Sequence, residues 1–177
     1  MNIFYVHNCP TTAAHMLCDK HVVKMILETA QLLSTAHRVL DGDKRADTLG
    51  LYKSTHKSHP SAVWVRKGAL NYIWTARHLA ALCGEYRLRY GKVHKTQRLL
   101  VGLSLLPDNI PRDVGRSEPP ACMPDQYKRA CTVTSYRLYY VAEKAYFAKW
   151  YGNPEKGPDW FYDPRYKDQP KDRPLAA

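Results

Sequence analysis

Apolar residues recur along most of the chain at helical spacing. From about residue 12 to residue 40 they return every three or four positions, which predicts one long helix that Gly42 and its neighbours end. A second helix is expected from Pro60, which suits a helix start, to about Tyr90, where Gly91 can close it. A shorter helix over 93–103 and a last long helix over 125–150 complete the pattern.

The segments between these helices carry turn-forming and polar residues. Residues 3–6 are an apolar run that could be a brief strand or an extended lead-in. Residues 105–124 contain five prolines, which predicts a long surface loop. We therefore expect an all-α fold with three long helices plus short ones, in one compact domain over residues 1–151. The proline-rich tail, residues 152–177, would pack on this domain or extend from it.

The first long helix has an unusually narrow polar stripe. At about 100° per residue, its polar side chains fall within an arc of roughly 100°. They are Lys20, His21, Lys24, Glu28, Gln31 and Thr35. The rest of the helix is mostly apolar, which predicts burial on the other sides. A carboxylate between an ammonium and an imidazole suits acid/base chemistry, so Glu28, with His21 and Lys24, is the candidate catalytic group. The alternative is a solvated helix face.

Charge is distributed unevenly along the chain. The net charge is +11, and residues 48–101 contain ten Lys or Arg but only one acid, Glu85. Solubility alone needs no such bias, so we expect a polyanionic partner, in the first place double-stranded DNA. The basic and polar residues expected to contact DNA are Lys20, Arg66, Lys67, Asn71, Lys92, His94, Lys95 and Arg137.

A basic loop precedes the second long helix. Its cations and hydroxyls lead into a helix N-terminus, where free backbone N–H groups favour an anion. The residues expected to bind phosphate or pyrophosphate are Lys53, Ser54, Thr55, His56, Lys57 and His59. A merely solvated loop is the alternative. A nucleotide-binding P-loop is not indicated, because no GxxxxGK[ST] pattern occurs.

The cysteines and histidines do not predict a metal site. Five scattered cysteines without a CxxC pair are typical of reduced thiols in an intracellular protein. His15, Cys18 and His21 are spaced by three, but such steps fan around a helix and lack carboxylate partners. We expect no metal and no cofactor. No apolar run approaches the roughly 20 residues of a membrane span.

Aromatic residues gather on two of the expected helices. Trp64, Asn71, Trp74 and His78 share one face, which is usually a core face. On the last helix tyrosines alternate with Arg137 and Lys144, a mixture that can stack bases or simply pack. We expect Tyr139 and Tyr146 to pack.

The motif Asp19-Lys20-His21, with Glu28 seven positions after the histidine, resembles the first long helix of the endonuclease V family of phage pyrimidine-dimer DNA glycosylases and AP lyases. The order of elements is also similar. Strings such as residues 18–25, 52–60 and 89–95 look like those of a widespread group of phage proteins. The resemblance implies an all-helical monomer that bends duplex DNA and extrudes a nucleotide, in the cytoplasm of an infected bacterial cell.

One position departs from this family. The family's nucleophile is the amine of an N-terminal threonine exposed by removal of Met1, assisted by the helix glutamate. Residue 2 here is Asn, whose size normally prevents removal of Met1. This chain therefore keeps the family's helix carboxylate, as Glu28, but lacks the N-terminal threonine amine.

Three hypotheses follow. The first is an amino acid:DNA transferase of phage type, in which a free amino acid or other amine displaces pyrophosphate from pyrophosphorylated 5-hydroxymethyluracil in DNA. The second is a glycosylase or AP lyase of the family's known kind. The third is a binder of bent or modified DNA without catalysis.

Overall fold

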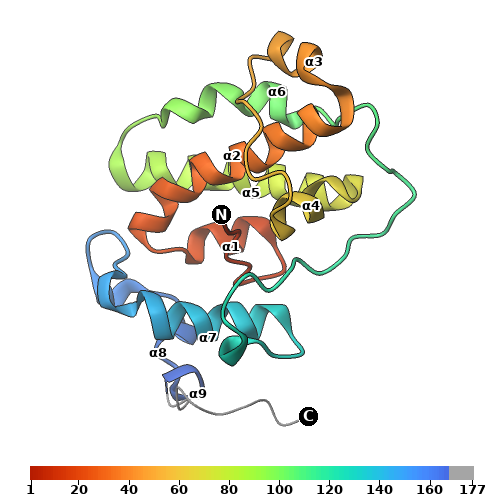
Figure 1. Cartoon of the computed structure of the whole chain (residues 1–177). Helices are drawn as coiled ribbons and strands as arrows, with labels where there is room; N and C mark the ends of the chain where they lie inside the picture. Colours follow the sequence, from red (N-terminus) through yellow and green to blue (C-terminus); the bar gives the residue numbers. More distant parts are fainter. Residues whose placement is uncertain (168–177) are drawn as a thin grey trace.

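The computed structural model describes residues 1–167, and every regular element in this range is helical (Figure 1). The all-α expectation is confirmed. The longer elements are α1 (Pro10–Met16), α2 (Asp19–Asp41), α3 (Asp43–Thr48), α4 (Pro60–Arg66), α5 (Ala69–Tyr90), α6 (Leu100–Ser104) and α7 (Thr132–Lys144). Short helices complete the fold: η1 (Lys95–Leu99), η2 (Asp125–Tyr127), η3 (Ala145–Phe147), η4 (Pro154–Lys156), α8 (Asp159–Tyr162) and α9 (Pro164–Lys167).

The predicted helix over 12–40 is wrong as a single element, since it breaks between α1 and α2. Leu17 and Cys18 have extended backbones, with ψ of 141° and 162°. Tertiary contacts satisfy their backbone groups: the Arg89 guanidinium donates to the Leu17 carbonyl at 2.8 Å, and the Cys18 N–H donates to the Tyr140 hydroxyl at 2.9 Å. These partners lie more than 70 positions away along the chain, so the local pattern could not reveal the break.

The predicted helix from Pro60 to Tyr90 is also interrupted, at Gly68 between α4 and α5. A Cβ at Gly68 would lie 3.3 Å from Val114, so the long loop packs directly onto this backbone. The end of α5 is as predicted, because Gly91 caps it in the left-handed conformation at φ 63°. The predicted helix over 125–150 is shorter, with α7 covering Thr132–Lys144 between η2 and η3.

Two layers position the site. In the upper part of Figure 1, α2 packs against α4 and α5, and α1 packs against α5. In the lower part, α7 packs with the C-terminal α8 and α9. Residues 3–6 form no strand and run as a buried lead-in between these parts, where Arg137 of α7 donates to the Val6 carbonyl at 3.0 Å.

The long loop over 105–124 crosses from α6 to η2 as predicted and is fixed by side chains of the core (Figure 1). The indole of Trp64 donates to the Ser117 carbonyl at 3.1 Å, and the Asn71 amide holds both the Ser117 N–H and its hydroxyl. The tail contributes buried side chains as well, since Trp160 is 6% and Phe161 8% exposed. No helix in the described part of the chain is long and apolar enough to cross a membrane.

Candidate active site

The polar stripe of α2 opens onto a cavity of about 300 Å³ beside the N-terminus of the chain. Glu28, Lys24 and His21 line it from α2, and Tyr139 and Lys144 line it from α7. The lining residues are completed by Met1, Asn2, Phe4, Met25 and Cys122. Four segments, which are the N-terminus, α2, the long loop and α7, therefore meet at the one carboxylate of the stripe.

Glu28 holds the nitrogen of residue 2. The Asn2 backbone N–H donates to Glu28 Oε2 at 3.1 Å, and Lys24 Nζ lies 3.5 Å from Glu28 Oε1. The Asn2 amide is anchored in turn, because its Nδ2 donates to the Cys122 carbonyl at 2.9 Å and its Oδ1 accepts from Ile3 N–H at 2.8 Å. The start of the chain is thus fixed against the candidate catalytic carboxylate.

His21 is neutral in this site. It is 6% exposed, its ring stacks on Phe4 with centroids 4.3 Å apart, and its Nδ1 lies 2.7 Å from the Tyr140 hydroxyl. Burial, with the nearby charges of Lys144 and Lys24, lowers the pKa of His21 to about 3. The imidazole can orient a partner by hydrogen bonding, but it carries no charge at neutral pH.

The basic loop runs along α2 and is pinned to it at two places. Buried Arg38 donates to the carbonyls of Tyr52 at 2.6 Å and Leu51 at 3.0 Å. One turn nearer the cavity, the Thr35 hydroxyl accepts from the Thr55 N–H at 3.1 Å and donates to the Thr55 carbonyl at 3.2 Å. Thr35, part of the polar stripe, therefore positions the loop rather than facing solvent.

The loop ends next to Glu28 and the N-terminus. The pKa of His59 is lowered, mainly by burial and then by the positive charges of the N-terminus and His56. The negative charge of Glu28 opposes this shift in part, so Glu28 lies close enough to His59 to act on it. His59, Met1, Cys122 and Lys128 line a second, open cavity of about 630 Å³, with Met1 and Cys122 shared by both cavities. The two cavities thus adjoin at the start of the chain.

The predicted phosphate-binding residues differ in availability. His56 and Lys57 are exposed, with His56 held at a φ of 49°, while Ser54 and Thr55 are half-buried. Lys53 points the other way and pairs with Asp47 at 3.0 Å. The end of the loop nearest Glu28 thus carries an accessible ammonium, Lys57, beside an accessible imidazole, His56.

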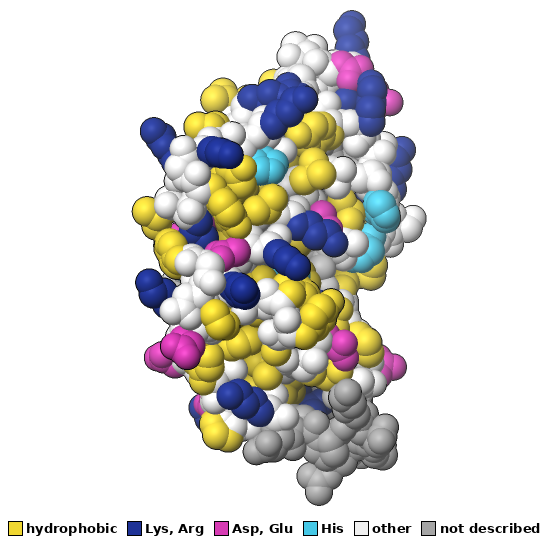
Figure 2. All heavy atoms as spheres, turned by 90° about the vertical axis from the view of Figure 1, so that its left-hand side faces the viewer, with side chains coloured by type: hydrophobic (Ala, Val, Ile, Leu, Met, Phe, Trp, Pro, Cys, Tyr) yellow, Lys and Arg dark blue, Asp and Glu magenta, His cyan; other side chains and the backbone are white. Residues whose placement is uncertain are grey.

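Most of the predicted DNA-binding residues lie at the surface. Lys20, Lys67, Lys92 and Lys95 are exposed, and Figure 2 shows Lys and Arg side chains spread among hydrophobic ones over the left-hand face of Figure 1. Arg66 donates to the Lys57 carbonyl at 2.8 Å and so supports the basic loop. His94 is half-buried and caps η1 by accepting from Thr96 N–H.

Two of these residues are occupied inside the fold. Asn71 is 1% exposed and holds Trp64 and the long loop, so its amide is not presented to DNA. The Arg137 guanidinium bonds the Val6 carbonyl and lies 5.3 Å from the centre of the Trp160 ring. The burial of Asn71 disagrees with its predicted DNA contact, because both ends of its amide bond groups inside the fold. Arg137 is only half-buried, and Nε is the guanidinium nitrogen that bonds Val6, so its burial alone does not exclude a DNA contact.

The predictions for the aromatic residues are confirmed at some positions and wrong at one. Trp64, Trp74 and His78 are buried as expected of a core face, at 5%, 4% and 0% exposed. Tyr139 packs against Tyr127, with ring centroids 5.4 Å apart, as expected. Tyr146 does not pack as predicted, since it is 87% exposed.

The sequence did not single out Cys122 or Lys144 as parts of the site. Lys144 was visible only as a cation among aromatic residues of α7, and no local signal marks Cys122. Asn2 entered only through the resemblance, as the position of the family's N-terminal amine. Among the described residues, no group of three or more His, Cys, Asp or Glu is placed to hold a metal ion.

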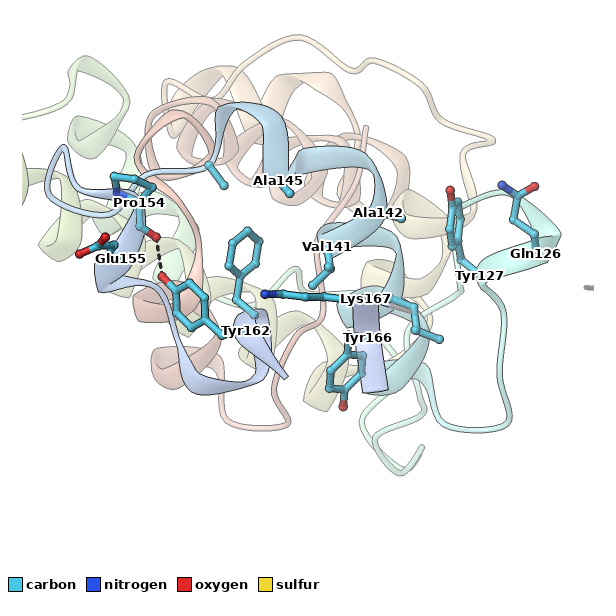
Figure 3. A pocket seen from close by; sticks show the side chains of 13 residues that line it. Gln126, Tyr127, Val141, Ala142, Ala145, Pro154, Glu155, Tyr162, Tyr166 and Lys167 are labelled. Carbon is cyan, nitrogen blue, oxygen red and sulfur yellow. Dashed lines mark hydrogen bonds between the residues drawn. The ribbon is translucent and has the colours of Figure 1, made fainter. Parts of the chain in front are cut away.

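A separate pocket of about 560 Å³ lies on the opposite side of α7, between that helix and α8–α9 (Figure 3). Its walls are mostly apolar, and Lys167 extends across it with its ammonium 5.7 Å from the centre of the Tyr162 ring. Leu138, Val141 and Ala145 line this pocket, whereas Tyr139 and Lys144 line the Glu28 cavity. We do not assign the chemistry to it, because its polar groups do not converge on one point.

The fold and site define an all-α protein with one carboxylate fixed beside its N-terminus under a basic surface. A family model described as pyrimidine dimer DNA glycosylase matches residues 1–98, more than half of the 177-residue chain, and the chain belongs to this family of DNA-acting enzymes. Comparisons with curated proteins and with solved structures found no match. The matched range includes Glu28, the basic loop and α5, while α7 and the tail lie beyond it.

Proposed function

We propose that this protein modifies a pyrimidine in double-stranded DNA by joining an external amine to an extruded nucleotide, with Glu28 as the group that binds and deprotonates the amine. The observation that carries the proposal is the contact between Glu28 Oε2 and the nitrogen of residue 2. A carboxylate in this position can bind the ammonium of a substrate and then take its proton.

The finer reaction is transfer onto pyrophosphorylated 5-hydroxymethyluracil. The amine nitrogen attacks the methylene carbon on C5 of the base, the carbon–oxygen bond breaks, and pyrophosphate leaves with the bonding electrons. The proton lost by the amine passes to Glu28. His56, Lys57 and His59 of the basic loop, with Lys24 and Lys144 at the cavity, would stabilise the leaving anion.

The identity of residue 2 supports an external amine. With Met1 in place, the nitrogen that contacts Glu28 belongs to a peptide bond and is not nucleophilic. The free amino acid or other amine then supplies what the chain itself lacks, and no cofactor is needed.

Glycosylase and AP lyase activity is the second candidate, favoured by the same 3.1 Å contact if Met1 is removed. The Asn2 nitrogen would then be a primary amine beside Glu28. It could attack C1′ of the sugar, break the glycosidic bond and leave an imine that borohydride reduces to a stable adduct.

One set of assays separates these reactions. The protein is mixed with duplex DNA containing pyrophosphorylated 5-hydroxymethyluracil and labelled amino acids, and pyrophosphate and labelled DNA are measured. In parallel, borohydride trapping is performed on abasic duplex DNA, and the intact mass shows whether Met1 is present. Pyrophosphate release that depends on the amine supports transfer; no release with any amine refutes it, and a trapped adduct on a protein without Met1 establishes the lyase.

Glu28→Gln tests the role of the carboxylate. We expect turnover to fall by about 10² to 10⁴, the usual contribution of a general base. DNA affinity should stay the same or rise, because a charge that repels phosphate is removed. Glu118→Gln, at an exposed acid outside both cavities, is the control and should retain full activity. Glu28→Gln protein that still turns over normally would refute the catalytic role of this carboxylate. Glu28→Gln protein that binds DNA but turns nothing over would eliminate the non-catalytic binder.

A further inference from the structure

Tyr146 is the most exposed aromatic side chain in the described part of the chain, at 87%. It lies in the middle of η3, the short turn that follows α7. Tyr151 is 51% exposed and its ring is covered by the Arg89 guanidinium at 5.0 Å; Tyr90 is 39% exposed and its ring packs on Tyr86 at 4.9 Å.

The Tyr146 ring has one aromatic contact among the described residues and is otherwise exposed. Tyr146 contacts the neighbouring Phe147 ring edge to face at 4.8 Å. Phe147 in turn lies edge to face with His21 at 5.4 Å, and Lys20 Nζ lies 5.1 Å from the centre of the Phe147 ring. The protruding tyrosine is therefore supported by α2, the helix that carries Glu28.

This support connects Tyr146 to two residues that line the Glu28 cavity. His21 and Lys144 both line the cavity. The His21 ring contacts Phe147, which contacts Tyr146, and Lys144 precedes Tyr146 by two residues. Exposed Lys20 and Lys149 and half-buried Lys144 surround the turn. An aromatic ring between ammonium groups suits nucleic acid, because the ring stacks on bases while the cations contact phosphates.

We propose that Tyr146 inserts into the base stack of duplex DNA and fills the gap left by the nucleotide that enters the Glu28 cavity. The inference rests on the proposed function only in requiring an extruded nucleotide, not in any step of the chemistry. Opening a stack is unfavourable, and apolar or aromatic wedges compensate for it in other proteins that distort DNA. Tyr146 belongs to the part of the chain beyond the family match, so it would be a feature of this protein's own C-terminal half.

The test uses DNA that cannot react. Affinity is measured for a duplex with a central tetrahydrofuran abasic analogue and for the same duplex without it, with 2-aminopurine next to the analogue as a stacking reporter. The variants are Tyr146→Ala, Tyr146→Phe and the control Tyr90→Ala, which removes another exposed aromatic, at the C-terminal end of α5.

We expect wild-type protein to prefer the abasic duplex and to change the 2-aminopurine emission. Tyr146→Ala should bind this duplex on the order of 10-fold more weakly, lose the preference and leave the emission unchanged, since stacking on an aromatic ring contributes roughly 5- to 150-fold per base. Tyr146→Phe and Tyr90→Ala should behave as wild type.

Two results would overturn the wedge. One is Tyr146→Ala protein with wild-type affinity and emission on the abasic duplex, and the other is Tyr146→Phe protein with the full loss, which would assign the effect to the hydroxyl instead of the ring. Failure of pyrophosphate release or of adduct trapping would overturn the proposed chemistry and leave these binding results unaffected.

Discussion

Thr35→Val tests how the basic loop is held against α2. The Thr35 hydroxyl is fully buried and makes two hydrogen bonds, accepting from the Thr55 N–H at 3.1 Å and donating to the Thr55 carbonyl at 3.2 Å. Valine has nearly the same shape but no hydroxyl. At about 0.5–1.5 kcal/mol for each hydrogen bond, the substitution should lower the free energy of unfolding by roughly 1–3 kcal/mol.

Thr29→Val is a matched control on the same helix. Thr29 is also fully buried, but its hydroxyl has no hydrogen-bond partner among the described residues. Replacing an unsatisfied buried hydroxyl by a methyl group should leave stability unchanged or raise it. The difference between the two variants thus isolates the contacts to the loop.

Urea unfolding at pH 7 gives both free energies, and DNA affinity gives the functional consequence. We expect Thr35→Val alone to weaken DNA binding, because Lys57 and the polar residues beside it lose their fixed place near Glu28. Equal destabilisation by the two substitutions would refute the reasoning. So would a destabilised Thr35→Val protein with unchanged affinity, since the loop would then not depend on this anchor.

Two further predictions concern pH and salt. The pKa values of buried His21 and His78 are lowered to about 3 and about 4, so below pH 6.5 the unfolded chain binds protons that the folded protein does not, and stability is lost as pH falls towards these values. Urea unfolding at several pH values should show the free energy of unfolding decline by up to about 2.7 kcal/mol per pH unit from these two groups. His21→Phe should remove about half of this decline. A free energy of unfolding that does not change between pH 6.5 and 5 would contradict the assignment. DNA affinity should fall steeply with salt, and Lys57→Gln should reduce the slope of log affinity against log salt by about 0.9. Arg137→Gln should leave that slope unchanged, because this guanidinium is engaged by Val6 and Trp160; a reduced slope would show that it contacts phosphate after all.

The sequence predicted the helical architecture because that signal is local. Apolar periodicity located α2, α5 and α7, and Gly91 marked the end of α5 by its freedom to adopt a left-handed backbone. The breaks at Leu17–Cys18 and at Gly68 were not predictable in this way. In both places a distant segment supplies the hydrogen bonds or the packing that favours an interruption over a continuous helix.

In the site, too, local features were predictable from the sequence and long-range contacts were not. The sequence pattern separated Glu28 from the apolar faces of its helix and indicated a role for the basic loop, because both features depend on residue type and spacing. It assigned Asn71 to DNA, whereas the Asn71 amide is buried and bonds Trp64 and Ser117. It also expected Tyr146 to pack, whereas that side chain is exposed. Exposure and hydrogen-bond partners depend on which segments come together, and sequence spacing does not contain that information.

By itself, then, the sequence determined a basic all-α protein with one carboxylate on a narrow polar stripe. Only the tertiary structure decided what that carboxylate faces: the nitrogen of residue 2 at 3.1 Å and a cavity closed by α7 from more than 100 positions away. The physical reason is that helix formation is governed by neighbours within a few residues, whereas a site is made by long-range packing of a hydrophobic core that brings distant polar groups to one point.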